Sequence, residues 1–163
     1  MNALVLFSSK TGNTRKLAET VFDNLPGEKS MLPVDAAPDL SAYDLVAVGF
    51  WLQGGKPDPK TAAVLPKVAD RKLFLFATHG AAADSEHAAN AMAQAKSLAP
   101  HAQVVGTFSC PGEVDPAFLV KVRAKDPQPP WVKDAPSAVG HPNRADLDRL
   151  AQRVKALVPD ASA

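Results

Sequence analysis

Four short apolar runs limit the folds open to this chain more than any other feature of it. They are rich in Val, Leu and Phe, are bounded by turn residues, and cover residues 3–7, 45–51, 73–78 and 104–108. Because their apolar character is continuous and not alternating, these runs indicate strands buried on both faces, as in a parallel sheet covered by helices. A fifth run, residues 29–34, contains Pro33 and polar residues, which fits an edge strand.

Helical patterns fill the spaces between these runs. Leu17, Val21 and Leu25 repeat at helical spacing after the first run. The other helices are predicted to start at Asp58–Pro59, where Pro66 shortens or kinks the helix, to cover residues 86–98, and to start at about Arg144 after Asn143. Strand and helix alternate throughout, so the chain is predicted to be α/β, a three-layer doubly wound sandwich around a five-stranded parallel sheet.

A long proline-rich connection interrupts this alternation. Residues 110–142, which we call the Pro-rich segment, separate the last predicted strand from the last predicted helix, and a short helix fits residues 117–125. No linker divides the chain, so residues 1–163 are predicted to form one domain with this segment inserted. The segment leaves the carboxyl end of a parallel strand, the edge at which such sheets bind ligands, and connections of this length are often functional.

Composition and charge exclude several classes of protein. The chain has 163 residues and a net charge of +1, which predicts attraction neither to nucleic acid nor to a membrane. A single cysteine, Cys110, excludes an internal disulfide framework and is expected to be a buried, inert thiol. His87, His101 and His141 show no metal-ligand spacing. The absence of a basic leader before the first apolar run favours a cytoplasmic location.

The sequence Ser8–Thr14, which we call the hydroxyl loop, stands directly between the first predicted strand and the first predicted helix. A helix N-terminus offers unpaired backbone amides and the positive end of a dipole, which suits a phosphate. Gly12 allows the backbone to approach a ligand closely. The side chains that add donors are those of Ser9, Thr11, Asn13 and Thr14. The loop therefore predicts a site for a terminal phosphate; the alternative is that these residues only cap the helix.

The run Ser9-Lys10-Thr11-Gly12-Asn13-Thr14 resembles the phosphate signature of flavodoxins, [ST]-x-T-G-x-T. The P-loop and the dinucleotide fingerprint are both absent. The resemblance implies strand order 2-1-3-4-5 and FMN as the cofactor. The motifs FxCxG at residues 108–112 and HPN at residues 141–143 resemble those of flavodoxin-like proteins with a long connection after the fifth strand.

The same resemblance implies that two further loops hold the flavin ring. The first ring loop supplies Phe50, Trp51, Leu52, Gln53 and Gly54, and the second supplies Thr78, His79, Gly80 and Ala81. Trp51 either stacks on the flavin or fills the core at a strand end. His79 either contacts the ring or is a solvated loop histidine. Trp131 is the candidate cover of the other ring face, although packing within the Pro-rich segment is the favoured interpretation.

Flavodoxin resemblance implies an electron carrier that passes electrons through FMN between a reductase and an acceptor protein. An NAD(P)H-dependent FMN or quinone reductase of the same fold is the alternative, as is an accessory flavoprotein subunit of a separate reductase. Fold alone does not choose among these, and the sequence predicts neither the oligomeric state nor the redox partners.

Overall fold

The computed structural model describes residues 1–36 and 38–158. The strands are β1 (Asn2–Phe7), β2 (Glu28–Pro33), β3 (Leu45–Gln53), β4 (Lys56–Pro57), β5 (Lys72–His79) and β6 (Gln103–Pro111). The α-helices are α1 (Asn13–Asn24), α2 (Pro59–Val64), α3 (Glu86–Ser97), α4 (Pro116–Arg123) and α5 (Arg144–Leu157). Short 3₁₀ helices are η1 (Val34–Ala36), η2 (Leu40–Ala42), η3 (Leu65–Val68) and η4 (Pro130–Ala138).

The sheet has the predicted parallel topology. Its strand order is β2-β1-β3-β5-β6, and the two-residue strand β4 pairs antiparallel with the end of β3. With β4 set aside, this is the order 2-1-3-4-5, so the predicted fold class is confirmed. The proline-containing run forms β2, an edge strand as expected.

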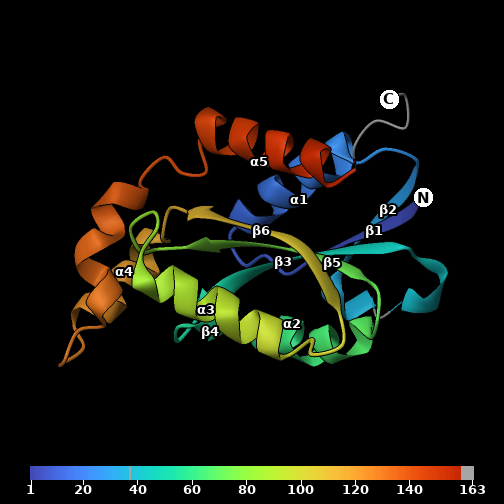
Figure 1. Ribbon diagram of the computed structural model, residues 1–163. Coiled ribbons are helices and arrows are strands. Elements are labelled where there is room, and N and C mark those ends of the chain that lie inside the picture. The colour runs from blue at the N-terminus through green and yellow to red at the C-terminus, as the bar shows by residue number, and fades with distance from the viewer. Residues whose placement is uncertain (37, 159–163) are drawn as a thin grey trace.

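Two apolar layers sandwich the sheet. Helices α1 and α5 lie on one face, and α2 and α3 lie on the other (Figure 1). Side chains from alternate positions of β5 divide between the layers: Phe74 and Phe76 pack on the α1/α5 side, while Leu73 and Leu75 pack on the α2/α3 side. Burial on both faces is the reason why the central strands are continuously apolar in sequence.

The caps of α2 and α5 lie at the predicted residues, Asp58 and Asn143. Asp58 caps α2 by accepting from the Thr61 amide, Ser85 caps α3, and Asn143 caps α5 in a capping box with Asp146. After Val64 the α2 helix tightens into η3, which contains Pro66, so the proline shortens the helix as expected.

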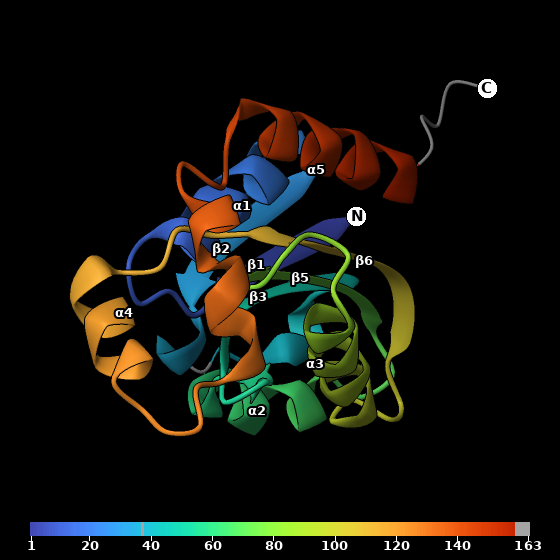
Figure 2. The ribbon, with the colours of Figure 1, turned by 90° about the vertical axis from the view of Figure 1, so that its left-hand side faces the viewer.

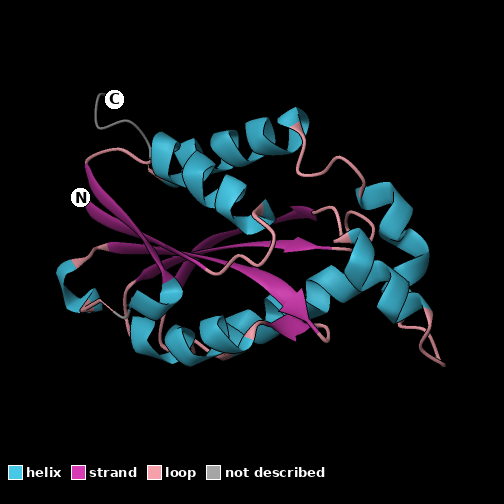
Figure 3. Cartoon of the chain, turned by 180° about the vertical axis from the view of Figure 1, so that it is seen from behind, coloured by secondary structure: helices cyan, strands magenta, loops and turns pink. Residues whose placement is uncertain are grey.

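The Pro-rich segment forms α4 and η4 beyond the carboxyl end of the sheet. Both helices lie across that edge when it faces the viewer (Figure 2) and project beyond the strand ends when the molecule is seen from behind (Figure 3). The strand β6 continues through Cys110 and Pro111, so the segment leaves the sheet two residues later than the sequence pattern indicated. Helix α4 matches the short helix expected near residues 117–125.

Within residues 1–36 and 38–158, no helix has the length and apolar character needed to cross a bilayer. The same residues contain no group of three or more potential metal-ligating side chains.

Candidate functional site

The hydroxyl loop lies at the carboxyl end of β1, where Gly12 precedes α1 with a φ of 95°. Ser9 Oγ accepts hydrogen bonds from the backbone amides of Gly12 at 3.1 Å and Arg15 at 3.3 Å. In the part of the chain that the structure describes, the amides of Asn13 and Thr14 have no acceptor. Unpaired amides at the positive end of a helix favour an anion at this position.

Two side chains of the hydroxyl loop bond to other parts of the protein. The hydroxyls of Thr14 and Thr78 are 3.0 Å apart in a buried hydrogen bond. Asn13 Nδ2 donates to the carbonyl oxygen of Glu113 at 2.9 Å. These side chains, expected as phosphate donors, therefore connect the loop to β5 and to the Pro-rich segment.

The base of the hydroxyl loop is tied to the first ring loop by a buried carboxylate. Ser8 Oγ donates to Asp58 Oδ1 at 2.9 Å, and the Asp58 amide donates to the Trp51 carbonyl at 3.1 Å. Asp58 is 1% exposed and also accepts from the Thr61 hydroxyl at 2.9 Å. One residue thus holds both loops in fixed relation.

The first ring loop is a tight hairpin that carries Trp51. Gln53 pairs with Lys56, and the intervening Gly54 and Gly55 have φ values of 60° and 76°. Positive φ at both turn positions explains the two glycines. Trp51 is half-buried, and Lys10 Nζ lies 5.6 Å from the centroid of its ring.

His79, at the end of β5, is buried at 4% exposure, so the expectation of a solvated loop histidine is wrong. Its Nδ1 lies 3.1 Å from the Ala81 carbonyl oxygen. Because a carbonyl only accepts, Nδ1 carries the hydrogen and Nε2 is the lone-pair nitrogen. Burial lowers the pKa of His79 to about 4, against a smaller opposing effect of the Ala81 carbonyl, so the imidazole is neutral near pH 7.

The three loops open into one cavity of about 530 Å³. The sequence-predicted site residues that line it are Ser9, Lys10, Thr11, Asn13, Thr14, Trp51, Leu52, Gln53, Gly54, Thr78, His79 and Gly80. Gly55 and His87 of α3 also line it. The rest of the wall comes from the Pro-rich segment, namely Glu113, Val114, Asp115, Phe118, Val122, Lys125, Pro129, Pro130 and Trp131. The cavity therefore joins the anion-favouring loop to a mainly apolar space.

Three residues predicted to touch the cofactor do not line the cavity. Phe50 is fully buried in the α2/α3 layer, because residues alternate between the two faces of β3. Ala81 is buried at 1% exposure and contributes its carbonyl to His79. Gly12 has no side chain and serves as the left-handed N-cap residue of α1.

The Pro-rich segment packs closely on both sides of the cavity. A Cβ atom at Gly80 would lie 2.6 Å from Val114 Cγ2 and 3.1 Å from the Trp131 ring. A Cβ atom at Gly112 would lie 2.9 Å from Asn13 Nδ2. Trp131 thus stands against the second ring loop, and glycine at position 80 leaves room for it.

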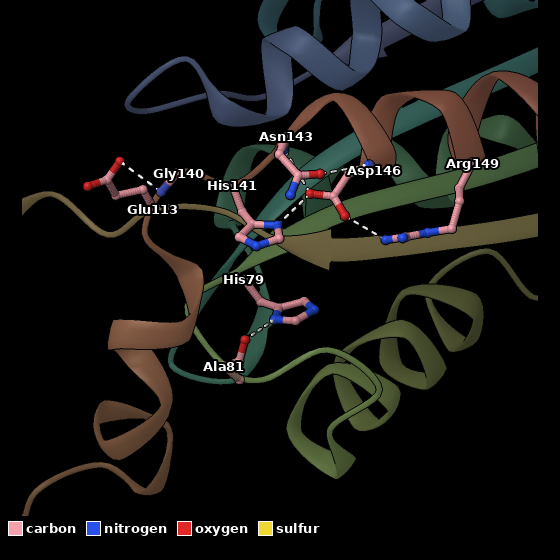
Figure 4. A network of polar contacts seen from close by, with 8 residues as sticks. All are labelled: His79, Ala81, Glu113, Gly140, His141, Asn143, Asp146 and Arg149. Carbon is pink, nitrogen blue, oxygen red and sulfur yellow. Dashed lines mark hydrogen bonds and ion pairs between the residues drawn. The ribbon is translucent and has the colours of Figure 1, made fainter.

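A polar network holds the end of the Pro-rich segment in place (Figure 4). The amide of Glu113 donates to the His141 carbonyl at 2.8 Å, and the Gly140 amide donates to a carboxylate oxygen of Glu113. His141 Nδ1 donates to Asp146 Oδ2 at 2.6 Å, at the first turn of α5. The HPN motif therefore joins the start of the segment to the start of α5.

Comparison with known proteins decides the family. A family model described as Flavodoxin domain matches residues 4–155. The flavodoxin-like domain-containing protein BilS of Clostridioides difficile (strain CD3) is 33% identical over 128 residues, which are 76% of this chain and 73% of that protein. The chain belongs to the flavodoxin domain family.

Solved structures show that this flavodoxin-family fold is shared widely. Oxidised flavodoxin 2 from Bacillus cereus has a TM-score of 0.63 and 15% identity, covering 96% of this chain and 97% of that chain. The flavoprotein of Lactobacillus acidophilus NCFM, solved in complex with FMN, has a TM-score of 0.55 and 17% identity, covering 66% of this chain and 92% of that chain. FMN is the ligand of the Lactobacillus protein.

The residues of this flavodoxin-family site fit FMN. The unpaired amides of Asn13 and Thr14 suit the phosphate, and the adjoining apolar space with Trp51 suits a planar ring. The family assignment supports the same cofactor.

Sequence reasoning missed the lining that the Pro-rich segment supplies. The position of the segment after a parallel strand indicated the correct edge, but Val114, Phe118 and Val122 belong to no motif. It also missed the bond between Ser8 and Asp58, which lie fifty residues apart in sequence.

Proposed function

We propose that the protein binds one FMN in this cavity and carries electrons between a reductase and an acceptor protein. A single observation carries the proposal: the hydroxyl loop, with its unpaired helix amides, lines the same cavity as Trp51. FMN supplies the redox chemistry when bound, and the protein supplies binding, orientation and access.

Residues of the three loops would hold the cofactor. The amides of Asn13 and Thr14, with the hydroxyl of Thr11, would bind the phosphate. Trp51 would pack on the ring, and Gly54 supplies the positive φ of 60° that the turn beside it needs. His79 is neutral near pH 7, so it adds no charge beside the ring.

Anaerobic titration with dithionite tests the electron-carrier role. Purified protein loaded with FMN is expected to take up electrons in two separate one-electron steps, each with its own absorption spectrum. Protein that retains no FMN after gel filtration would contradict the binding site itself. Matched variants are Thr11→Ala in the cavity and Ser41→Ala in η2, of which only the first should weaken FMN binding.

Stopped-flow mixing with NADH or NADPH separates the carrier from a reductase. A carrier is expected to be reduced slowly by either nucleotide and rapidly only by a reductase. Rapid reduction by the nucleotide alone, with uptake of two electrons in one step, would replace the carrier by an NAD(P)H-dependent reductase.

A further inference from the structure

Helix α4 has two faces with different surroundings. Phe118 and Val122, four residues apart on α4, line the cavity, and so does Lys125, two residues beyond the helix. Among the described residues of α4, Val122 alone has a buried side chain. The inner face of α4 is therefore a wall of the proposed FMN site, and the rest of the helix is turned away from it.

The outer face carries an exposed apolar stripe. Ala117, Val120 and Ala124 follow one another at spacings of three and four residues, so they share one side of the helix. All three are exposed, and the Val120 side chain is 68% exposed, the largest value among the exposed large hydrophobic residues. Burial of such a stripe is favourable, so this face suits a partner surface.

Cations flank this stripe on both sides. In helical projection Lys121 and Arg123 flank the stripe, one on each side, and both are exposed. Within the described residues, neither side chain forms an ion pair. Asp115 accepts from the Ala117 amide as the N-cap of α4. Along residues 116–126 the sequence has three cations, Lys121, Arg123 and Lys125, and one carboxylate, Asp126. The outer face is thus apolar along its centre and positive at its edges.

We propose that the outer face of α4, made up of Ala117, Val120, Lys121, Arg123 and Ala124, is the docking surface for an electron-transfer protein with an acidic rim. The inference rests on the proposed function. Charge complementarity selects the partner, because positive edges attract carboxylates and repel other basic surfaces. The place of α4 in the fold suits electron transfer, because only this one helix, about 10 Å thick, would separate a docked partner from the cavity.

The experiment uses a reduced plant-type [2Fe–2S] ferredoxin, an acidic protein, as the probe donor to the FMN-loaded protein. Stopped-flow rates are measured at low and high salt for wild type, for Lys121→Glu/Arg123→Glu, and for Lys67→Glu/Lys155→Glu. The last pair makes the same charge change on exposed residues of η3 and α5. FMN retention is measured first for each protein. All variants are expected to retain FMN, because none of the four substituted residues lines the cavity.

At low salt we expect the α4 double variant to accept electrons at least about tenfold more slowly than wild type, with the difference disappearing at high salt. The control variant should stay within about twofold of wild type, and Val120→Ser should slow the reaction at both salt concentrations. Equal rates in all proteins, or no electron transfer despite bound FMN, would overturn the docking surface alone. Loss of FMN from wild type would overturn the proposed function. A wild-type dimer that Val120→Ser dissociates would overturn the proposed partner and assign this face to a second copy of the chain.

Discussion

The sheet and the Pro-rich segment hold their positions in different ways. Strands β5 and β6 pair along their length, from Lys72 with Gln103 to His79 with Pro111. Residues 112–142 of the segment, beyond these strands, form no strand. They meet the second ring loop and the hydroxyl loop at a few close points, where Val114 and Trp131 lie against Gly80 and Gly112 lies against Asn13. Many repeated strand contacts therefore stabilise the sheet, whereas a few specific side-chain contacts hold the segment that closes the cavity.

The largest expected effect is on the stability of the sheet. At Gly49 in β3, a Cβ atom would lie 2.2 Å from Cε2 of Phe76, so Gly49→Ala forces an aromatic ring out of the core. We expect the free energy of unfolding to fall by about 3 kcal/mol, as measured by urea denaturation. The double variant Gly49→Ala/Phe76→Leu should recover part of the loss. Full stability in the single variant would contradict the packing described.

The next effect concerns His79, where the sheet meets the segment. Its pKa of about 4 lies below the ordinary value of 6.5, so the unfolded chain binds a proton more readily than the folded one. Stability is therefore full above pH 6.5 and falls as the pH drops toward 4, by about 3 kcal/mol in total. His79→Gln should remove this part of the pH dependence, and the exposed control His101→Gln should not. Identical pH profiles in all three proteins would show that His79 is not buried in its neutral form.

A smaller effect separates the segment from the sheet. In Gly80→Ala the new methyl group would meet Val114 Cγ2 at 2.6 Å, so the segment is expected to shift while the sheet remains paired. FMN should bind about tenfold more weakly, equivalent to about 1.4 kcal/mol, with a change in unfolding free energy below about 1 kcal/mol. Fluorescence titration of FMN and urea denaturation measure the two quantities. Gly80→Ala/Val114→Ala should restore part of the affinity, because the close contact with the Trp131 ring remains. A loss of stability larger than the loss of affinity would place Gly80 with the sheet core.

The smallest effect probes the junction at Cys110. The thiol is 1% exposed, and burial raises its pKa to about 12, with a further contribution from the Asp146 carboxylate. Native protein is expected to leave a thiol reagent such as DTNB unreacted at pH 8, and urea-unfolded protein should react with one equivalent. Rapid reaction of the native protein would show that the end of β6 opens.

The parallel sheet, its edge strand, the helix caps and the location of the anion-favouring loop can all be predicted from the sequence alone. Each of these follows from local chemistry: continuous apolar runs, a side-chain oxygen before a helix, or hydroxyls and a glycine between a strand and a helix. The two glycines at residues 54–55 likewise indicated the turn that they form.

Which side chains face the cavity depends on tertiary packing and cannot be predicted from local sequence. Phe50 and Trp51 are neighbours in sequence, yet the alternation of β3 sends Phe50 into the core and Trp51 to the cavity. The sequence predicts the side chains of Asn13 and Thr14 as phosphate donors. In the structure the Asn13 side chain hydrogen-bonds to Glu113, and the Thr14 side chain hydrogen-bonds to Thr78. Contacts between residues so far apart in sequence depend on the packing of the whole chain, which no local pattern encodes.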